Sequence, residues 1–290
     1  MTKVSCSIPE RFVNPLFEVF DGGDFILSSY RDIEKPLTEM RIYFEDAKDT
    51  EAAKKALGDA LEIVGVAADL AVEDVPEDDW KFAYRRHFKT ELVSPRIFTV
   101  PEWEAEEFFA SGRAEAGQVA IVSDPGMAFG TGKHETTKAC LQYIDELLSP
   151  TPTAFSNSFL DMGTGSGILS IAAAKLGCAK VTAFDVDEEA VEAAKENAAK
   201  NRVDVEVFRY GLGAKVRREL PVCDLVVANI LGPLLIRFAD EIAPTVGRNL
   251  VISGILDELY PEVLAAYVAH GFREVSHKTI GEWTTGLLVR

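Results

Sequence analysis

The stretch 159–170 constrains the fold of this chain more than any other part of its sequence. Its residues are Phe-Leu-Asp-Met-Gly-Thr-Gly-Ser-Gly-Ile-Leu-Ser, in which an apolar pair and Asp161 precede Gly163, Gly165 and Gly167. Glycine is required where the backbone takes a positive φ or where a ligand touches the main chain. A run of small and apolar residues, 168–176, follows with helix-forming composition. The stretch therefore predicts a strand, a tight glycine turn and a helix.

A second acid supports a nucleoside ligand at this turn. Asp185 ends the apolar run 181–184, about twenty residues after Gly165. A carboxylate at the tip of the neighbouring strand can accept hydrogen bonds from both ribose hydroxyls. Together the two features predict a nucleoside cofactor, and a glycine-rich turn in an ordinary parallel α/β sheet is the alternative.

The glycine spacing favours one cofactor over another. A dinucleotide fingerprint places its third glycine three residues after the second, but that position holds Ile168 here. The observed pattern after an acid resembles the first motif of S-adenosylmethionine-dependent methyltransferases. That resemblance implies that Asp161 faces the ligand's ammonium or a nearby water and that the glycines lie against its methionine part. A dehydrogenase or an inactive nucleotide-binding module remains the alternative.

Composition excludes several classes of protein. No apolar run approaches the roughly 18 residues that span a membrane, and no signal-peptide core begins the chain. The cysteines and histidines are scattered without metal-ligand spacing, so we expect no metal site, and we expect the cysteines to be buried in a reducing cytoplasm. They are Cys6, Cys140, Cys178, Cys223, His87, His134, His270 and His277.

The net charge of −17 bears on the partner. Binding to nucleic acid phosphates requires a basic face, so we expect no direct nucleic acid partner. An acidic surface suits a basic protein substrate, although solubility alone also explains it. We expect the protein to be a monomer.

Residues 1–75 predict a separate α+β domain. The pattern gives strands at 3–7, 25–30, 38–44 and 68–72, with helices at 9–20 and from 49 or 50 to 63. This βαββαβ order is ferredoxin-like. It carries no catalytic constellation, so substrate recognition and a structural appendage are both open. A helix at 76–88 then begins a connector, 76–95, and the catalytic domain spans 96–290.

Two further stretches end at the predicted ligand edge. Residues 124–137 hold three glycines and lead into a helix at Thr137, so this loop can wrap a polar ligand or be an ordinary loop. The buried strand 224–229 ends in Asn229, at the carboxyl edge where α/β sheets bind ligands. Its uncharged amide can hold an attacking atom without competing for its proton, and a turn-forming asparagine is the alternative.

The remaining pattern completes a sheet. A fifth strand at 250–253, a helix at 257–270 and a hairpin of 272–280 with 283–289 follow. Five parallel strands and a terminal hairpin predict an α/β fold with the Rossmann-like sheet of class I methyltransferases, beside the small ferredoxin-like domain.

The three stretches together resemble the ribosomal protein L11 methyltransferase (PrmA) family over about residues 76–290. The 124–137 loop joined to Asn-Ile-Leu at 229–231 carries most of the resemblance, with Ser-Gly-Ile-Leu at 253–256 and Glu-Trp at 282–283. The resemblance implies cofactor contacts at Thr137, Gly163, Asp185 and Asn229. The glycine motif adds Gly165 and Asp161 to these contacts. The resemblance also implies an N-terminal domain that recognises the ribosomal protein. Residues 208–211 offer no acid for an adenine contact.

The implied reaction moves methyl groups to lysine or N-terminal amines of a large-subunit ribosomal protein. A lysine with a pKa near 10.4 is neutral only about once in 2,500 at pH 7, which costs roughly 4–5 kcal/mol, and desolvation reduces that cost. No dedicated base is obvious. We expect Asn229 to be the catalytic residue that orients the amine while water takes the proton. A lysine methyltransferase for another protein, such as an electron-transfer flavoprotein subunit, is the alternative.

Overall fold

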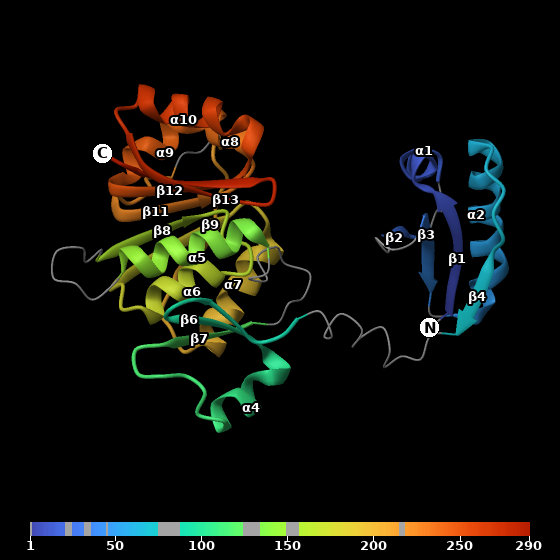
Figure 1. The fold of residues 1–290 in the computed structure, drawn as a ribbon, viewed down its shortest axis with the longest axis horizontal. Coiled ribbons are helices and arrows are strands. Elements are labelled where there is room, and N and C mark those ends of the chain that lie inside the picture. Colours follow the sequence, from blue (N-terminus) through green and yellow to red (C-terminus); the bar gives the residue numbers. More distant parts are fainter. Residues whose placement is uncertain are drawn as a thin grey trace. The chain divides into compact units, whose positions relative to one another are not determined.

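The computed structural model describes residues 2–20, 25–31, 36–44, 46–74, 88–123, 134–148, 157–214 and 218–290. The chain divides into two compact units, Met1–His87 and Phe88–Arg290 (Figure 1). The predicted boundaries at 75 and 95 stay a prediction, and the predicted helix at 76–88 lies almost wholly outside the described residues. Within the described part of the chain, no helix is both long enough and apolar enough to cross a membrane.

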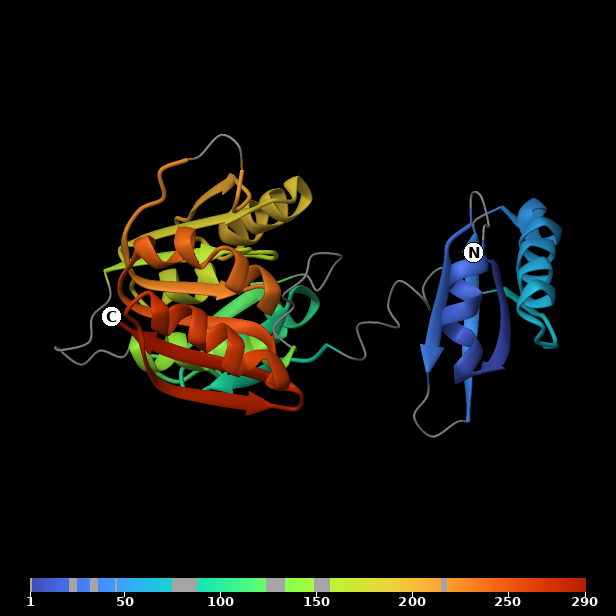
Figure 2. The same ribbon diagram turned by 90° about the horizontal axis from the view of Figure 1, so that it is seen from above.

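The N-terminal unit has the predicted βαββαβ order. Its elements are β1 (Thr2–Pro9), α1 (Val13–Val19), β2 (Leu27–Arg31), β3 (Leu37–Phe44), α2 (Thr50–Val64) and β4 (Ala71–Asp74), with 3-10 turns η1 (Glu10–Phe12) and η2 (Ala47–Asp49). The antiparallel sheet runs β2-β3-β1-β4, the strand order of a ferredoxin-like fold, and Figure 1 labels these strands. Figure 2 shows the same unit, coloured blue to cyan, from above. The predicted helix 9–20 begins later than expected, because Pro9 is extended and pairs with Leu37 at the end of β1.

Alternation along the strands builds the core of this unit. Val4, Cys6 and Ile8 on β1 are buried, as are Met40 and Ile42 on β3. Successive strand residues point to opposite faces, so these side chains share the face that α1 and α2 cover. The helix α2 ends at Val64, one residue beyond the predicted 63, and Gly65 with a φ of 73° caps it.

The second unit is built on a seven-stranded sheet in the order β10-β9-β8-β11-β12-β14-β13. The strands are β8 (Ser158–Met162), β9 (Lys180–Asp185), β10 (Glu206–Arg209), β11 (Cys223–Asn229), β12 (Val246–Leu256), β13 (Arg273–Ile280) and β14 (Trp283–Val289). The first five are parallel, and the terminal hairpin adds two antiparallel strands. This confirms the predicted methyltransferase sheet. The fifth strand is longer than the predicted 250–253, with a register shift between Ile252 and Ile255.

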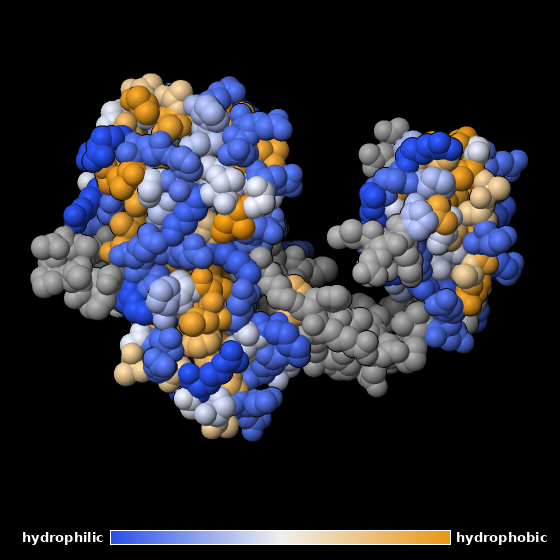
Figure 3. Space-filling model, in the orientation of Figure 1, coloured by the Kyte–Doolittle hydropathy of each residue, from blue (hydrophilic) through white to orange (hydrophobic). Residues whose placement is uncertain are grey.

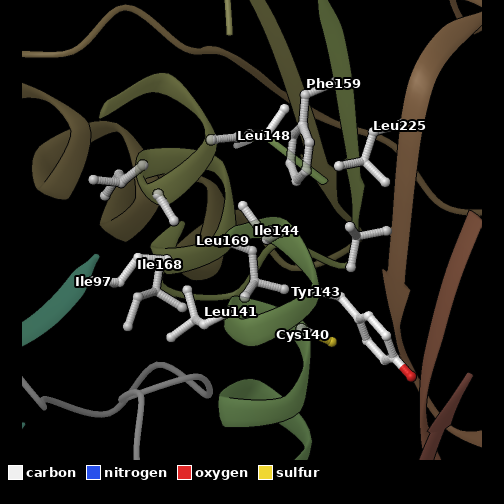
Figure 4. Packing of buried hydrophobic residues seen from close by; sticks show 14 of the residues in the cluster. Ile97, Cys140, Leu141, Tyr143, Ile144, Leu148, Phe159, Ile168, Leu169 and Leu225 are labelled. Atoms are coloured by element: carbon white, nitrogen blue, oxygen red, sulfur yellow. The ribbon is translucent and has the colours of Figure 1, made fainter. Parts of the chain in front are cut away.

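Helices cover both faces of this sheet. One face carries α5 (Glu135–Leu147), α6 (Ile168–Lys175) and α7 (Glu188–Lys200), and the other carries α8 (Gly232–Arg237), α9 (Ala239–Ile242) and α10 (Tyr260–Ala269). Figure 4 shows the first layer, where Ile144 of α5 and Leu169 of α6 pack toward Phe159 and Leu225. On the faces shown in Figure 3, mainly hydrophilic residues lie around smaller apolar patches.

A small third sheet packs against α5. It comprises β5 (Glu91–Ser94), β6 (Ile97–Pro101) and β7 (Val119–Ser123), and β6 leads into η4 (Glu102–Glu104) and α4 (Ala105–Ala110). Strand β7 was not predicted. Arg96 in the β5–β6 turn ties this sheet to α5: its Nε donates to Asp145 Oδ1 at 2.6 Å, and its main-chain N–H donates to Oδ2 at 3.1 Å.

We expect Asp145→Ala to destabilise this unit by about 2–3 kcal/mol, because it leaves the largely buried Arg96 without its carboxylate. The side chains of Arg96 and Asp145 are only 22% and 5% exposed. A control, Glu146→Ala, removes the 58% exposed partner of Lys278 and should cost under about 1 kcal/mol. Differential scanning calorimetry of the full chain measures both. Equal midpoint shifts in the two variants would show that the Arg96 contact does not stabilise the unit.

Candidate active site

The glycine turn after β8 has the predicted backbone. Gly163, Gly165 and Gly167 have φ values of 73°, 53° and 81°. The N–H groups of Gly163 and Thr164 both donate to the Phe184 carbonyl at 3.0 Å, which ties the turn to the neighbouring strand β9. A side chain at any of the three glycines would strain the backbone. The turn therefore presents bare main chain at the carboxyl edge of the sheet.

Asp185 lies at the end of β9 and holds this turn. Its Oδ2 accepts the Gly165 N–H at 2.9 Å, and its Oδ1 accepts the Asp187 N–H at 3.1 Å. Each carboxylate oxygen can accept more than one hydrogen bond, so both keep capacity for a ligand hydroxyl. The predicted pairing of the turn with an acid on the next strand is thus present in the structure.

Asp185 and the turn border a cavity of about 300 Å³, called here the adenosyl cavity. Apolar and aromatic side chains form most of its remaining wall. The lining residues are Gly163, Gly165, Phe184, Asp185, Val186, Tyr210, Gly211, Leu212, Ile230, Leu234 and Phe238. Flat apolar walls beside a carboxylate suit a nucleoside. Tyr210 and Gly211 belong to this wall, in the stretch 208–211 where the sequence offered no acid for an adenine contact.

Asp161 is fully buried beneath the turn. Its Oδ2 accepts the hydroxyls of Thr164 and Ser170, both at 2.7 Å. Its Oδ1 is buried and has no hydrogen-bond partner among the described residues. Burial raises the pKa of the Asp161 carboxyl to about 6, and the negative charge of Asp185 adds to the rise, while the two hydroxyls oppose it. One oxygen is therefore held in place and the other lacks a partner.

Asn229 ends β11, as predicted, and borders a second cavity of about 410 Å³, called here the amine cavity. Its Oδ1 is buried without a hydrogen-bond partner in the described part of the chain. The rings of His134 and Trp283 meet edge to face, with centroids 5.2 Å apart. The lining residues are His134, Thr136, Asn229, Ile230, Leu231, Leu234, Gly254 and Trp283.

Ile230 lies between the two cavities and lines both of them. Leu234 also lines both. A Cβ added to Gly163 would lie 2.6 Å from the Ile230 Cγ2 atom, and one added to Gly254 would lie 2.5 Å from the Ile230 carbonyl oxygen. Both distances are far below van der Waals contact. The two glycines therefore make room for Ile230, and the cavities adjoin at this side chain.

Thr137 lines neither of the two cavities. Its side chain is fully buried in the first turn of α5, and its Oγ1 has no hydrogen-bond partner among the described residues. The preceding Thr136 lines the amine cavity, and its hydroxyl lies 2.8 Å from His134 Nδ1. The glycine-rich part of the predicted loop, 124–133, lies outside the described residues.

These features fit a nucleoside cofactor with an amino acid end. The turn presents main chain, Asp185 keeps acceptor capacity, and three buried side-chain oxygens lack partners in the described residues: Asp161 Oδ1, Thr137 Oγ1 and Asn229 Oδ1. Buried polar groups in proteins are normally paired, so the Asn229 oxygen beside the amine cavity indicates a ligand, whereas Asp161 and Thr137 line neither cavity. The prediction missed the remaining wall residues, of which only the motifs around His134 and Trp283 gave any signal.

We expect Asp161→Asn to reveal the raised pKa as a pH-dependent difference in stability. Between the unfolded pKa of 3.8 and the folded pKa of about 6, the folded carboxyl binds a proton that the unfolded chain has lost. Stability from this group therefore falls as pH rises through that window. The amide oxygen of the variant can still accept a hydrogen bond from a hydroxyl. Relative to this variant, the wild type should lose about 1 kcal/mol of unfolding free energy between pH 5 and pH 7. Urea unfolding followed by circular dichroism measures this, and a pH-independent difference would contradict it.

Comparisons with known proteins agree with this geometry. The family model described as ribosomal protein L11 methyltransferase (PrmA) matches residues 23–290, which is more of the chain than the expected 76–290. A ribosomal protein L11 methyltransferase of Geotalea daltonii is 35% identical, covering 98% of this chain and 96% of the relative. One from Geobacter sulfurreducens is 37% identical, covering 97% and 95%.

A solved structure extends the comparison to the fold. The ribosomal protein L11 methylase from Lactobacillus delbrueckii subsp. bulgaricus matches with a TM-score of 0.59 and 31% identity, covering 70% of this chain and 99% of that one. The family model and the near full-length relatives settle the assignment. The chain belongs to the ribosomal protein L11 methyltransferase (PrmA) family, whose methyl donor is S-adenosylmethionine.

Proposed function

We propose that this protein transfers methyl groups from S-adenosylmethionine to lysine or N-terminal amino groups of ribosomal protein L11. One observation carries the proposal: the adenosyl cavity and the amine cavity adjoin at Ile230, with Asp185 beside the first and Asn229 beside the second, whose amide oxygen has no hydrogen-bond partner among the described residues. The substrate follows from the names of the relatives. Family membership removes the oxidoreductase alternative.

Residues around the adenosyl cavity would hold the cofactor. The Asp185 oxygens would accept the ribose hydroxyls, and the apolar walls would contact the adenine. Asp161 Oδ1 and Thr137 Oγ1, both orphaned among the described residues, would serve the amino acid end. The main chain of Gly163 and Gly165 would lie against the methionine part. When bound, the cofactor supplies an electrophilic methyl group on a sulfonium, which is a good leaving group.

Residues around the amine cavity would prepare the attacking nitrogen. Asn229 Oδ1 would accept an N–H of the amine, which turns the nitrogen lone pair toward the adenosyl cavity. The apolar walls, including Trp283 and Leu234, exclude water and disfavour the charged ammonium, so they lower the pKa of the amine. Asn229 cannot take a proton itself, so the proton leaves to water before transfer.

The N-terminal unit supports the choice of substrate. We assign it the recognition of the ribosomal protein, because it is compact and separate from the catalytic unit. The net charge of −17 favours a basic protein and opposes direct contact with nucleic acid phosphates. We propose that the enzyme acts as a cytoplasmic monomer.

Replacing the ribose-binding acid should weaken cofactor binding. We expect Asp185→Ala to raise the Kd for S-adenosylmethionine about 30- to 100-fold, because two charge-assisted hydrogen bonds are lost. Isothermal titration calorimetry measures this. The matched control is Asp204→Ala, which removes an exposed acid that borders neither cavity and should leave the Kd unchanged. An unchanged Kd in the Asp185 variant would remove this residue from the cofactor site.

Replacing Asn229 should slow methyl transfer itself. At saturating cofactor we expect Asn229→Ala to lower kcat about 100-fold, because the amine loses the acceptor that orients it. Transfer is measured by mass spectrometry of purified ribosomal protein L11 incubated with enzyme and S-adenosylmethionine. The exposed Asn157→Ala serves as the control. Wild-type turnover in the Asn229 variant would exclude the role of this side chain, and an unmethylated substrate with the wild-type enzyme would exclude the function.

A further inference from the structure

The segment after β10 forms one wall of the adenosyl cavity and is tied down from outside it. Tyr210 and Leu212 line the cavity, whereas Glu241 of α9 does not. Glu241 nevertheless uses both carboxylate oxygens on this segment. Its Oε1 accepts the Tyr210 hydroxyl at 2.5 Å, and its Oε2 accepts the Gly213 N–H at 2.8 Å. One side chain thus fixes both ends of the wall.

Packing holds the same segment against the corner between α8 and α9. Gly213 has a φ of 77°, and a Cβ there would lie 2.6 Å from the Cε1 atom of Phe238. Phe238 itself lines the adenosyl cavity. The main chain at Gly213 therefore sits directly on the Phe238 ring, and the Glu241 bond to its N–H keeps it there.

The other end of the segment is joined to the ribose-binding acid. The Tyr210 N–H donates to the Asp185 carbonyl at 2.9 Å, and the Tyr210 ring meets Phe184 edge to face with centroids 5.3 Å apart. Tyr210 is only 7% exposed. A shift of its hydroxyl end would move the ring that borders the cavity and disturb the backbone that carries Asp185.

We propose that Glu241 is a positioning residue that sets the affinity of the adenosyl cavity for the nucleoside end of the cofactor. This inference rests on the proposed function and adds to it a residue that touches neither cofactor nor substrate. Without the carboxylate, the Tyr210 hydroxyl and the Gly213 N–H both lose the acceptor that Glu241 provides, so the wall between them is held less firmly in one position. Asn229 and the amine cavity lie outside this wall segment, so the rate of the chemical step should be unchanged.

The test compares four single variants in the full-length protein. Glu241→Ala removes both contacts, and Tyr210→Phe removes one. Glu241→Gln can keep both, because its amide oxygen can accept the Gly213 N–H and its amide N–H can donate to the Tyr210 hydroxyl oxygen. Asp240→Ala is the matched control, because its neighbouring carboxylate is 96% exposed and faces His270 instead. Calorimetry gives the Kd for S-adenosylhomocysteine and for 5′-methylthioadenosine, which lacks the amino acid end. Kinetics on ribosomal protein L11 give KM for the cofactor and kcat.

We expect Glu241→Ala to raise both Kd values and the KM for the cofactor about tenfold, with kcat at saturating cofactor within about twofold of the wild type. Tyr210→Phe should fall between the alanine variant and the wild type. Glu241→Gln should recover most of the affinity, and Asp240→Ala should match the wild type. Equal losses for the two ligands place the effect at the nucleoside end.

Two results would overturn the inference. One is a Glu241→Ala variant with Kd values within twofold of the wild type. The other is a general loss, in which kcat, affinity and thermal midpoint fall together and glutamine does not restore them, as expected for a merely structural residue. Failure of the proposed function looks different, because the wild-type protein itself would then not bind S-adenosylhomocysteine.

Discussion

The hydrogen bond from the Gly165 N–H to the Asp185 carboxylate connects the ends of two neighbouring strands, and the rest of the site depends on it. It fixes the glycine turn and the acid relative to each other before any ligand arrives. Such preorganisation lowers the free energy needed to order a binding site. The two N–H groups that the turn donates to the Phe184 carbonyl strengthen the same connection. The edge of the sheet is therefore a rigid platform on which a nucleoside can be placed.

Around this platform, glycines serve two purposes that the sequence alone does not separate. All three glycines of the turn have positive φ values, yet Gly163 also gives space to Ile230, and Gly254 on β12 gives space to its carbonyl. Ile230 lines both the adenosyl and the amine cavity. The Asn-Ile-Leu segment thus places the amide of Asn229 next to the side chain that the two cavities share.

Sequence patterns predicted those parts of the fold that depend on local order. The strand–glycine–helix unit, the acid on the next strand, the parallel sheet with its terminal hairpin and the βαββαβ order of the N-terminal unit follow from periodicity and from turn residues. Strand β7 was missed because its short apolar run 119–123 has no alternation, and periodicity alone does not distinguish such a buried strand from a buried helical segment. The boundaries of α1 were shifted because Pro9 extends β1 instead of starting a helix.

The cavity walls were less predictable because they join residues far apart in the chain. Thr136 and Thr137 are both buried in the first turn of α5, but of the two only Thr136 lines the amine cavity beside Trp283, and the register of α5 against the sheet decides this. Likewise, Glu241 meets Tyr210 across 31 residues of sequence. No local pattern marks such a pair, since its partners come together only when α9 packs against the segment that follows β10.

The proposed function requires one nucleoside to lie across the ends of β8 and β9. A crystal structure of the protein with S-adenosylhomocysteine tests that placement most directly. We predict ribose hydroxyls on the Asp185 carboxylate, adenine between the walls of the adenosyl cavity, and the sulfur directed past Ile230 toward Asn229. Ligand density elsewhere on the protein, or a ribose without contact to Asp185, would contradict the account.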